Sequence, residues 1–147
     1  MGAVGLELKF IFDKIEPIEK YLELREKYNF DARNGLNLIM TGEHWSEIED
    51  EGRLMTMLEK KLNIDLSILD YWNEDDNGNF VDLDLLLPKL VEFKNCIQNN
   101  PDFYKEILYN IEDYYLKEQL KRDIEFLIER VNFNIQNGAK KVRFETL

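Results

Sequence analysis

The stretch YYLKEQLKRDIEFLIERVNFNIQNGAKKVRFETL, residues 114–147, decides the fold that the sequence predicts. Its apolar residues recur at steps of three and four, which predicts a helix of roughly six turns with one apolar face. The apolar face holds Leu116, Leu120, Ile124, Leu127, Ile128, Val131 and Ile135. We expect water on the other face, which holds Lys117, Glu118, Lys121, Arg122, Asp123, Glu125 and Glu129.

A strand is expected directly after this helix. Asn137-Gly138 supplies a residue that tolerates the left-handed conformation in which helices commonly end. Residues 141–147 then alternate polar and apolar, with Val142 and Phe144 on one side, which is typical of a strand half covered by a core. A long amphipathic helix needs a sheet to lie on, and the terminal strand is expected to join that sheet.

Two further strands are expected upstream. Residues 4–12 alternate apolar and polar and form the clearest strand pattern in the chain. Residues 36–40, Leu-Asn-Leu-Ile-Met, are a second candidate, although they can equally be the run into the next helix. We therefore predict an α+β fold, a mostly helical single domain over residues 1–147. Its small sheet would combine strands near 4–12, 36–40 and 141–147 and pack on the long C-terminal helix.

Start signals and apolar stripes predict the remaining helices. Pro17 suits the first turn of one helix, and Asp65 can cap a short helix over residues 66–71. Asp84 can cap the next helix, with Pro88 still in its first turn. The expected stripes are Ile18, Tyr21, Leu22, Arg25 and Tyr28; Trp45, Ile48, Gly52, Met55, Leu58 and Leu62; and Leu86, Leu90, Phe93 and Ile97.

The composition is that of one globular domain. The chain has 147 residues, of which 44% are hydrophobic and 12% aromatic, enough for a core of its own. Cys96 is the single cysteine, so no intrachain disulfide can form, which favours a reducing compartment. Residues 1–12 carry no basic leader, and no apolar run is long enough to span a bilayer. We expect a cytoplasmic protein with no membrane partner.

The net charge of −11 is unevenly spread. Residues 62–88 contain no Lys or Arg and seven acids, and a second group of acids lies between Glu43 and Glu51. Such acidity argues against binding nucleic acid, because phosphate contacts need Lys and Arg. It favours steering toward a basic protein partner, and it serves solubility in any case.

Residues 73–84 resemble the calcium loop of the EF-hand family. Gly78 would take the sharp-turn position, with oxygen-bearing residues at alternate places before it. The resemblance implies calcium as the cofactor and, as its ligands, Asn73, Asp75, Asn77, Asn79 through its carbonyl, and Asp84. The family begins this loop with Asp and ends it with Glu, whereas this chain has Asn73 and Asp84. A polar Asn-Gly connection between two packed elements explains the same residues.

Catalysis finds no support in the sequence. His44 is the single histidine, and one His with one distant Cys falls short of the usual zinc ligand set. Cys96 lies among leucines on a predicted helix, where a buried, unreactive thiol is expected. His44 is expected to be a surface or half-buried side chain among acids. We therefore do not expect an enzyme.

Two pairs of adjacent aromatic residues, Tyr71-Trp72 and Tyr114-Tyr115, stand out. Neighbours on a helix point in different directions, so one residue of each pair is expected at the surface, where Tyr and Trp often anchor interfaces. The alternative is packing at the edge of the core. Together with the acidic clusters, the first pair predicts a protein-binding surface. Its expected residues are Glu43, Glu47, Asp50, Glu51, Asp70, Tyr71, Trp72, Asp75 and Asp76.

In size, acidity, lack of catalytic motifs and strand-first, helix-rich build, the chain resembles the small immunity proteins of bacterial polymorphic-toxin systems. The resemblance rests on the strand predicted at residues 4–12 and on the acidic clusters, and no functional residue carries over from it. It implies a cognate toxin, often a basic nuclease, as the partner. A metal-responsive module built on residues 73–84 is the second class of function, and an enzyme is the third.

Overall fold

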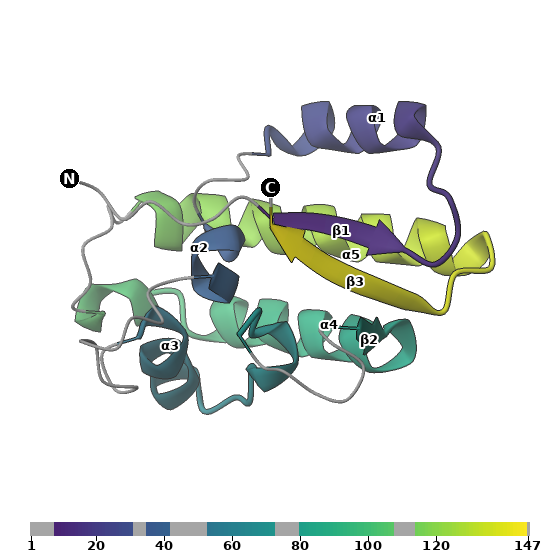
Figure 1. Ribbon diagram of the computed structural model, residues 1–147. Coiled ribbons are helices and arrows are strands. Elements are labelled where there is room, and N and C mark those ends of the chain that lie inside the picture. The colour runs from purple at the N-terminus through teal and green to yellow at the C-terminus, as the bar shows by residue number, and fades with distance from the viewer. Residues whose placement is uncertain (1–7, 31–34, 42–52, 73–79, 108–113, 147) are drawn as a thin grey trace.

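The computed structural model describes residues 8–30, 35–41, 53–72, 80–107 and 114–146. Helices make up most of this part of the chain, and three short strands form one sheet (Figure 1). In chain order the elements are β1 (Leu8–Phe12), α1 (Ile18–Tyr28), α2 (Leu36–Thr41), α3 (Leu54–Leu62), η2 (Ser67–Leu69), β2 (Phe80–Asp82), α4 (Leu83–Asn99), η3 (Phe103–Glu106), the π-helical η4 (Tyr115–Gln119), α5 (Leu120–Gln136) and β3 (Lys141–Thr146). The predicted class, a mostly helical α+β fold with a small sheet and a long C-terminal helix, is confirmed.

The C-terminal strand is the centre of the sheet. The strand order is β1-β3-β2, and β3 pairs antiparallel with both neighbours. Phe10 and Phe12 of β1 lie opposite Phe144 and Val142 of β3. The rings of Phe10 and Phe144 meet edge to face, with their centroids 5.5 Å apart. The strand predicted near residues 141–147 is therefore confirmed, and both other strands depend on it.

Helix α5 lies behind the sheet, with α1 on one side and α4 on the other (Figure 1). Leu120, Ile124, Leu127 and Val131 are at most 1% exposed, as the predicted apolar face requires. They belong to one hydrophobic core with Phe12 of the sheet. Each such side chain contributes about 1.5–3 kcal/mol on burial, so this helix face is a main source of stability.

The opposite face of α5 is only partly solvated, so the prediction of a charged, water-facing side is wrong for several residues. Asp123 is fully buried, at 0% exposed, and Lys121, Glu125 and Glu129 are half-buried. The reason is tertiary: α1 and α4 pack on α5, and the start of α2 covers Asp123, whose carboxylate accepts the Leu36 N–H.

Residues 36–40 form the helix α2 and not a strand, so this strand prediction is wrong. Every residue of α2 is buried. The segment therefore has no exposed positions whose spacing could distinguish a strand from a helix. Two local features start the helix. Gly35 has a left-handed φ of 65°, and the Leu36 N–H donates to the Asp123 carboxylate over 2.9 Å. The third strand is β2, which lies within the residues assigned to the calcium-like loop.

Helix α4 begins one residue before the predicted cap. Asp82 is the N-cap residue, and Asp84 lies in the first turn. The Leu83 N–H donates to the Lys140 carbonyl over 2.8 Å, so pairing with β3 decides where β2 ends and the helix begins. Pro88 lies inside the helix and not in its first turn, and its ring removes one backbone hydrogen bond there. The predicted core face of Leu86, Leu90, Phe93 and Ile97 is confirmed.

Helix α1 turns a different face to the core than its predicted stripe. Leu24 is buried, whereas Ile18 and Leu22 are 57% and 52% exposed and Arg25 is exposed as well, so the stripe is wrong for these three residues. Tyr21 and Tyr28 do face α5, where both rings lie edge-on to a buried phenylalanine. Two overlapping apolar stripes fit the sequence of α1, and only its contact with α5 decides between them.

Several other local predictions are confirmed. The Asp65 carboxylate accepts the Ser67 N–H over 2.9 Å at the start of η2. Gly138 has a left-handed φ of 94° just after α5 ends. The predicted stripe of α3 buries Met55, Leu58 and Leu62. Residues 4–7 of the first strand, and Trp45, Ile48 and Gly52 of the same stripe, lie outside the described residues.

Candidate functional site

Trp72 is the exposed aromatic residue of the predicted binding surface. It is 37% exposed, and its indole N–H donates to the Thr41 carbonyl over 3.0 Å. The Tyr71 ring stands edge-on to the indole, with centroids 5.1 Å apart and an angle of 83° between the rings. The prediction that one residue of this pair reaches the surface is confirmed. The indole is therefore accessible and also held in one position.

Backbone contacts tie this aromatic pair to the end of α2. The Tyr71 N–H donates to the Met40 carbonyl over 3.0 Å. The Trp72 N–H donates to the Asp70 carboxylate, also over 3.0 Å. The chain that leaves η2 is thus attached to the last two residues of α2, although about thirty residues separate the two segments in sequence.

Asp70 is held by an arginine. Both terminal nitrogens of Arg53 donate to the two Asp70 oxygens, at 3.0 Å each. The side chains are only 8% and 17% exposed, so the pair is largely shielded from water. A planar guanidinium matches a carboxylate in this bidentate geometry. Of the acids predicted for partner binding, Asp70 thus has its charge compensated within the fold.

These contacts bring together residues that flank the two acid-rich stretches of the sequence, 42–52 and 73–79. Residues 42–52 follow Thr41 and end at Arg53, and residues 73–79 follow Trp72. Because Thr41 bonds Trp72 and Arg53 bonds Asp70, the flanking residues of the two stretches are neighbours. We call Thr41, Arg53, Asp70, Tyr71 and Trp72 the Trp72 site.

The acidic excess of the chain belongs to stretches outside the described residues. The described residues include 18 acids and 18 bases, of the chain's 30 and 19. The other 12 acids and one base supply the whole net charge of −11. Eight of these acids lie in residues 42–52 and 73–79, the two stretches that adjoin residues of the Trp72 site in sequence. The described framework is thus neutral.

Most of the predicted site residues lie outside the described residues. Among the predicted partner-binding acids these are Glu43, Glu47, Asp50, Glu51, Asp75 and Asp76. Among the predicted calcium ligands they are Asn73, Asp75, Asn77 and Asn79. The fifth ligand, Asp84, is exposed in the first turn of α4. Within the described ranges, no three His, Cys, Asp or Glu side chains are grouped as a metal ion would require.

His44 also lies outside the described residues, and Cys96 lies on α4. The Cys96 side chain is half-buried, so the expectation of a buried thiol is only partly met. Desolvation raises the pKa of this thiol, and the nearby Glu92 carboxylate raises it further. A thiol with a raised pKa is a poor nucleophile, which agrees with the unreactive cysteine that we expect.

The second aromatic pair, Tyr114-Tyr115, precedes α5. Tyr114 is 45% exposed and Tyr115 is half-buried, so here too one residue reaches the surface, as predicted. The rings meet edge to face at 5.6 Å. A guanidinium nitrogen of Arg122 lies 3.5 Å from the Tyr114 hydroxyl, which is a long hydrogen bond. This pair is less firmly held than the Trp72 site.

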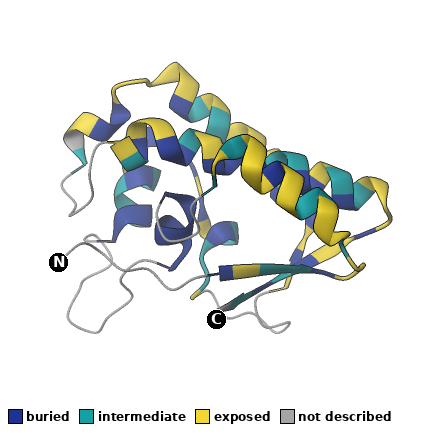
Figure 2. Ribbon diagram, turned by 90° about the horizontal axis from the view of Figure 1, so that it is seen from above, coloured by how far each residue is buried: buried dark blue, intermediate teal, exposed yellow. Residues whose placement is uncertain are grey.

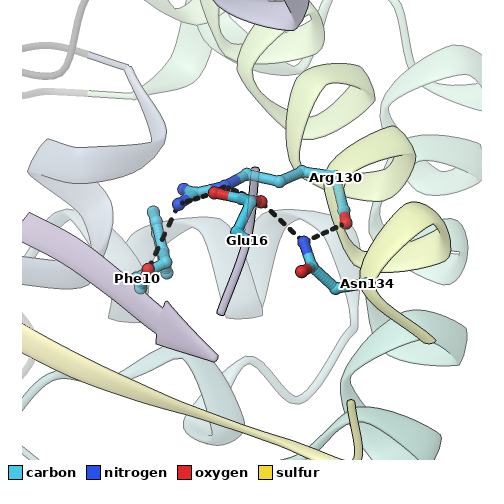
Figure 3. Close-up of polar contacts among 4 residues, drawn as sticks. All are labelled: Phe10, Glu16, Arg130 and Asn134. Atoms are coloured by element: carbon cyan, nitrogen blue, oxygen red, sulfur yellow. Dashed lines mark hydrogen bonds and ion pairs between the residues drawn. The ribbon is translucent and has the colours of Figure 1, made fainter. Parts of the chain in front are cut away.

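A buried polar cluster around Arg130 was missed by the sequence analysis (Figure 3). Its guanidinium donates to both Glu16 oxygens at 2.8–3.0 Å and to the Phe10 carbonyl at 3.1 Å. The Asn134 amide donates to the other side of Glu16 over 2.6 Å. The Tyr21 ring lies 4.6 Å from the guanidinium carbon. The spacing of Arg130 and Asn134 put both on one face of the helix, but nothing local indicates Glu16, more than a hundred residues away.

Asp123 is the second buried polar group that the sequence analysis missed. Besides the Leu36 N–H, its carboxylate accepts the Gln119 side-chain amide over 2.7 Å. A Cβ atom at Gly35 would lie 2.1 Å from a carboxylate oxygen of Asp123, so only glycine fits there. Both clusters join segments that are distant in sequence. Their polar groups are hydrogen-bonded to other parts of the protein.

Along the described parts of the chain, no helix combines the length and apolar character needed to cross a membrane. The described residues therefore present one accessible, fixed aromatic anchor with acid-rich sequence on both sides. Comparison with known proteins found no family model, no curated protein and no solved structure that matches this chain.

Proposed function

We propose that this protein is a non-catalytic binding domain that recognises a basic protein partner at the Trp72 site. One observation carries the proposal. An exposed tryptophan is locked to Thr41 at the point where both acid-rich stretches leave the described fold. Tryptophan is the residue type most often responsible for interface affinity, and a fixed side chain loses little conformational freedom on binding.

The acids and the aromatic anchor would have separate roles. Eight acids in residues 42–52 and 73–79 favour approach of a basic surface, which raises the association rate at low salt. The indole would then be buried by the partner, which slows dissociation. The neutral framework supports this division, because its balanced charges leave these two stretches as the source of a directed field.

The partner class that fits best is a cognate toxin, and the protein would then be a bacterial immunity protein acting in the cytoplasm. A basic nuclease fits the charge, and inhibition requires no chemistry from the inhibitor. This choice of partner is supported by the acidity and the size of the chain, and by its resemblance in build to immunity proteins. Solubility alone remains the competing explanation of the acidic stretches.

The test compares two variants with a candidate toxin encoded beside the gene for this protein. Reversing the charges of Glu47, Asp50, Asp75 and Asp76 to Lys should slow association about tenfold or more and flatten its salt dependence. Trp72→Ala should instead raise the dissociation rate, while Trp72→Phe should keep most of the affinity. Surface plasmon resonance at several salt concentrations separates the two rates.

A matched control reverses four exposed acids of the framework. Glu92 of α4, Asp102 at the N-cap of η3 and Glu118 of η4 are exposed, and their reversal together with that of the exposed Asp82 should leave the association rate near the wild-type value. If the first quadruple variant captured the toxin as fast as wild type in low salt, the acidic stretches would serve solubility and the proposal would fail.

Calcium binding by residues 73–84 is the second candidate function. The observation that favours it is the exposed Asp84 carboxylate, which stands at the closing position of the pattern. A calcium site would raise the melting temperature as calcium is added, because a ligand that binds only the folded protein stabilises it. If calorimetry detects no heat of binding at millimolar calcium, calcium binding is excluded as a function. The matched variant is Asp84→Asn.

A further inference from the structure

We propose that the outer face of α1 is a second docking surface, which binds an amphipathic helix of another protein that carries Lys or Arg along one edge. This surface, the α1 outer face, consists of Ile15, Ile18, Leu22, Glu19, Glu23 and Glu26. Helix α1 lies uppermost in Figure 1, whereas α2, which contains Thr41 of the Trp72 site, and α3, which follows Arg53, lie below it. The inference therefore does not depend on the proposed function.

Three aliphatic side chains form the apolar part of this face. Ile15, Ile18 and Leu22 are 99%, 57% and 52% exposed. Ile18 and Leu22, four residues apart, share a face of α1, and Ile15 lies in the non-helical segment just before the helix. Figure 2, which looks down on α1, shows mostly exposed residues along it. Single exposed apolar residues are ordinary, but a pair at a spacing of four matches the anchors by which helices pack on a partner.

The inner side of α1 is firmly attached, so the outer face is presented by a fixed helix. Leu24 is 1% exposed against the rest of the protein. The Tyr28 hydroxyl donates to the Glu129 carboxylate of α5 over 2.7 Å, and the Lys27 ammonium lies at the same distance from that oxygen. The Asn29 residue, with a left-handed φ of 50°, ends the helix cleanly. A preorganised helix needs little ordering when a partner binds.

A row of acids runs along one edge of the apolar side chains. Glu19, Glu23 and Glu26 are all exposed and follow each other at steps of four and three. Glu23 is 3.2 Å from the Lys20 ammonium, which leaves the row with a net negative charge. Arg25 is the exposed base nearest the apolar row within the helix. The chemistry of the face is thus an apolar row with an acidic border.

This charge pattern selects the occupant. Two copies related by a two-fold axis, with their α1 helices antiparallel, would set the same edge of each helix against the other, so that glutamates would meet glutamates. An anionic membrane surface is repelled by the same row. An amphipathic partner helix with Lys or Arg along one edge satisfies both the apolar and the acidic part. A single helix face offers less than the roughly 800 Å² per partner of a standard interface, so a micromolar Kd is expected.

The test titrates the full-length protein with three synthetic helical peptides of about five turns each. The first carries leucines at helical spacing with lysines along one edge, the second replaces the lysines by glutamates, and the third scrambles the first sequence. Binding is followed by amide chemical shifts in NMR spectra. We expect the lysine peptide to shift signals of α1 and to bind at least tenfold more tightly than the other two.

Variants locate the site and check its charge. Leu22→Gln and Ile18→Gln should each weaken binding of the lysine peptide about tenfold, since each removes a partly buried aliphatic anchor. Leu85→Gln is the matched control, because Leu85 is 62% exposed on α4 and should not affect binding. Glu19→Lys combined with Glu26→Lys should reverse the preference between the lysine and glutamate peptides. All five positions are exposed, so unchanged melting temperatures verify folding.

Four results would overturn the proposal. They are an absence of α1 shifts with the lysine peptide, equal affinity for the lysine and glutamate peptides, a wild-type dimer in analytical ultracentrifugation that Leu22→Gln abolishes, and co-sedimentation with anionic phospholipid vesicles that Leu22→Gln prevents. The last two would assign the α1 outer face to self-association or to a membrane surface.

Discussion

The described residues include two shielded arginine–carboxylate pairs, and they serve different purposes. Arg130 binds Glu16 with side chains 9% and 12% exposed, and Arg53 binds Asp70 with side chains 8% and 17% exposed. The first pair joins residues 114 positions apart, and the second joins residues 17 apart. The same kind of ion pair thus joins distant segments of the fold in one place and holds a local surface segment in the other.

The surroundings of the two pairs explain the difference. Arg130 also bonds the Phe10 carbonyl and lies within 4.6–5.6 Å of three aromatic rings, so it connects β1, α5 and the segment before α1. Asp70 instead shares its carboxylate with the Trp72 N–H, next to the exposed indole. Loss of the first pair should weaken the whole fold, whereas loss of the second should mainly release Trp72.

Arg130→Ala should give the largest loss of stability. Removing one partner of a buried pair costs about 3–5 kcal/mol, because Glu16 is left buried and uncompensated. Urea denaturation measures the free energy of unfolding. The double variant Arg130→Met with Glu16→Leu should recover part of the loss, since it leaves no lone charge. Equal losses for the single and double variants would contradict this account.

Gly35→Ala should come next. The added Cβ would lie 2.1 Å from the Asp123 carboxylate, and the φ of 65° disfavours any residue with a side chain. We expect a loss of roughly 2–4 kcal/mol from strain and from the displaced hydrogen bond. Gly138→Ala is the control, because the nearest atom there is the flexible end of Lys14 at 3.4 Å. A similar loss at both glycines would indicate backbone strain alone.

Arg53→Met should cost less, about 1–3 kcal/mol, because Asp70 keeps partial access to water. Its specific effect should be on Trp72, whose N–H shares the Asp70 carboxylate. In a Trp45→Phe background, where Trp72 is the single tryptophan, fluorescence anisotropy and acrylamide quenching should report a more mobile, more accessible indole. Arg130→Ala at a temperature where it is folded should leave both signals unchanged.

The smallest effect is expected at the surface pair of Lys27 and Glu129. The hydrogen bond from Lys27 lowers the pKa of the Glu129 carboxyl below its ordinary value of 4.5. A lowered folded-state pKa stabilises the fold above the unfolded value, and this contribution is lost as the pH falls through the folded value. Because both side chains are more than one-third exposed, water screens the pair and the effect should be small. Thermal melts from pH 7 to 3 should show a shallower acid decline for Glu129→Gln than for wild type.

The local sequence was sufficient for the elements whose pattern is repeated over many residues. Leu116 to Ile135 recur with a helical period, and this predicted α5 because the apolar face of a helix follows from side-chain spacing alone. The turn at Gly138 and the terminal strand followed from residue chemistry in the same way. One residue of each aromatic pair could be predicted at the surface, because adjacent residues point in different directions.

Other features depended on contacts between distant segments, and no local pattern carries that information. The buried residues 36–40 fit a strand or a helix equally well until Asp123 caps the helix from α5. Asp123 and Arg130 look like solvent-facing charges until α1, α2 and β1 cover them. Likewise, Trp72 could be named as an anchor from the sequence, but its fixed position depends on Thr41 and Asp70. Spacing along the chain determines which residues share a face, whereas burial and hydrogen-bond partners are decided only when separate segments pack together.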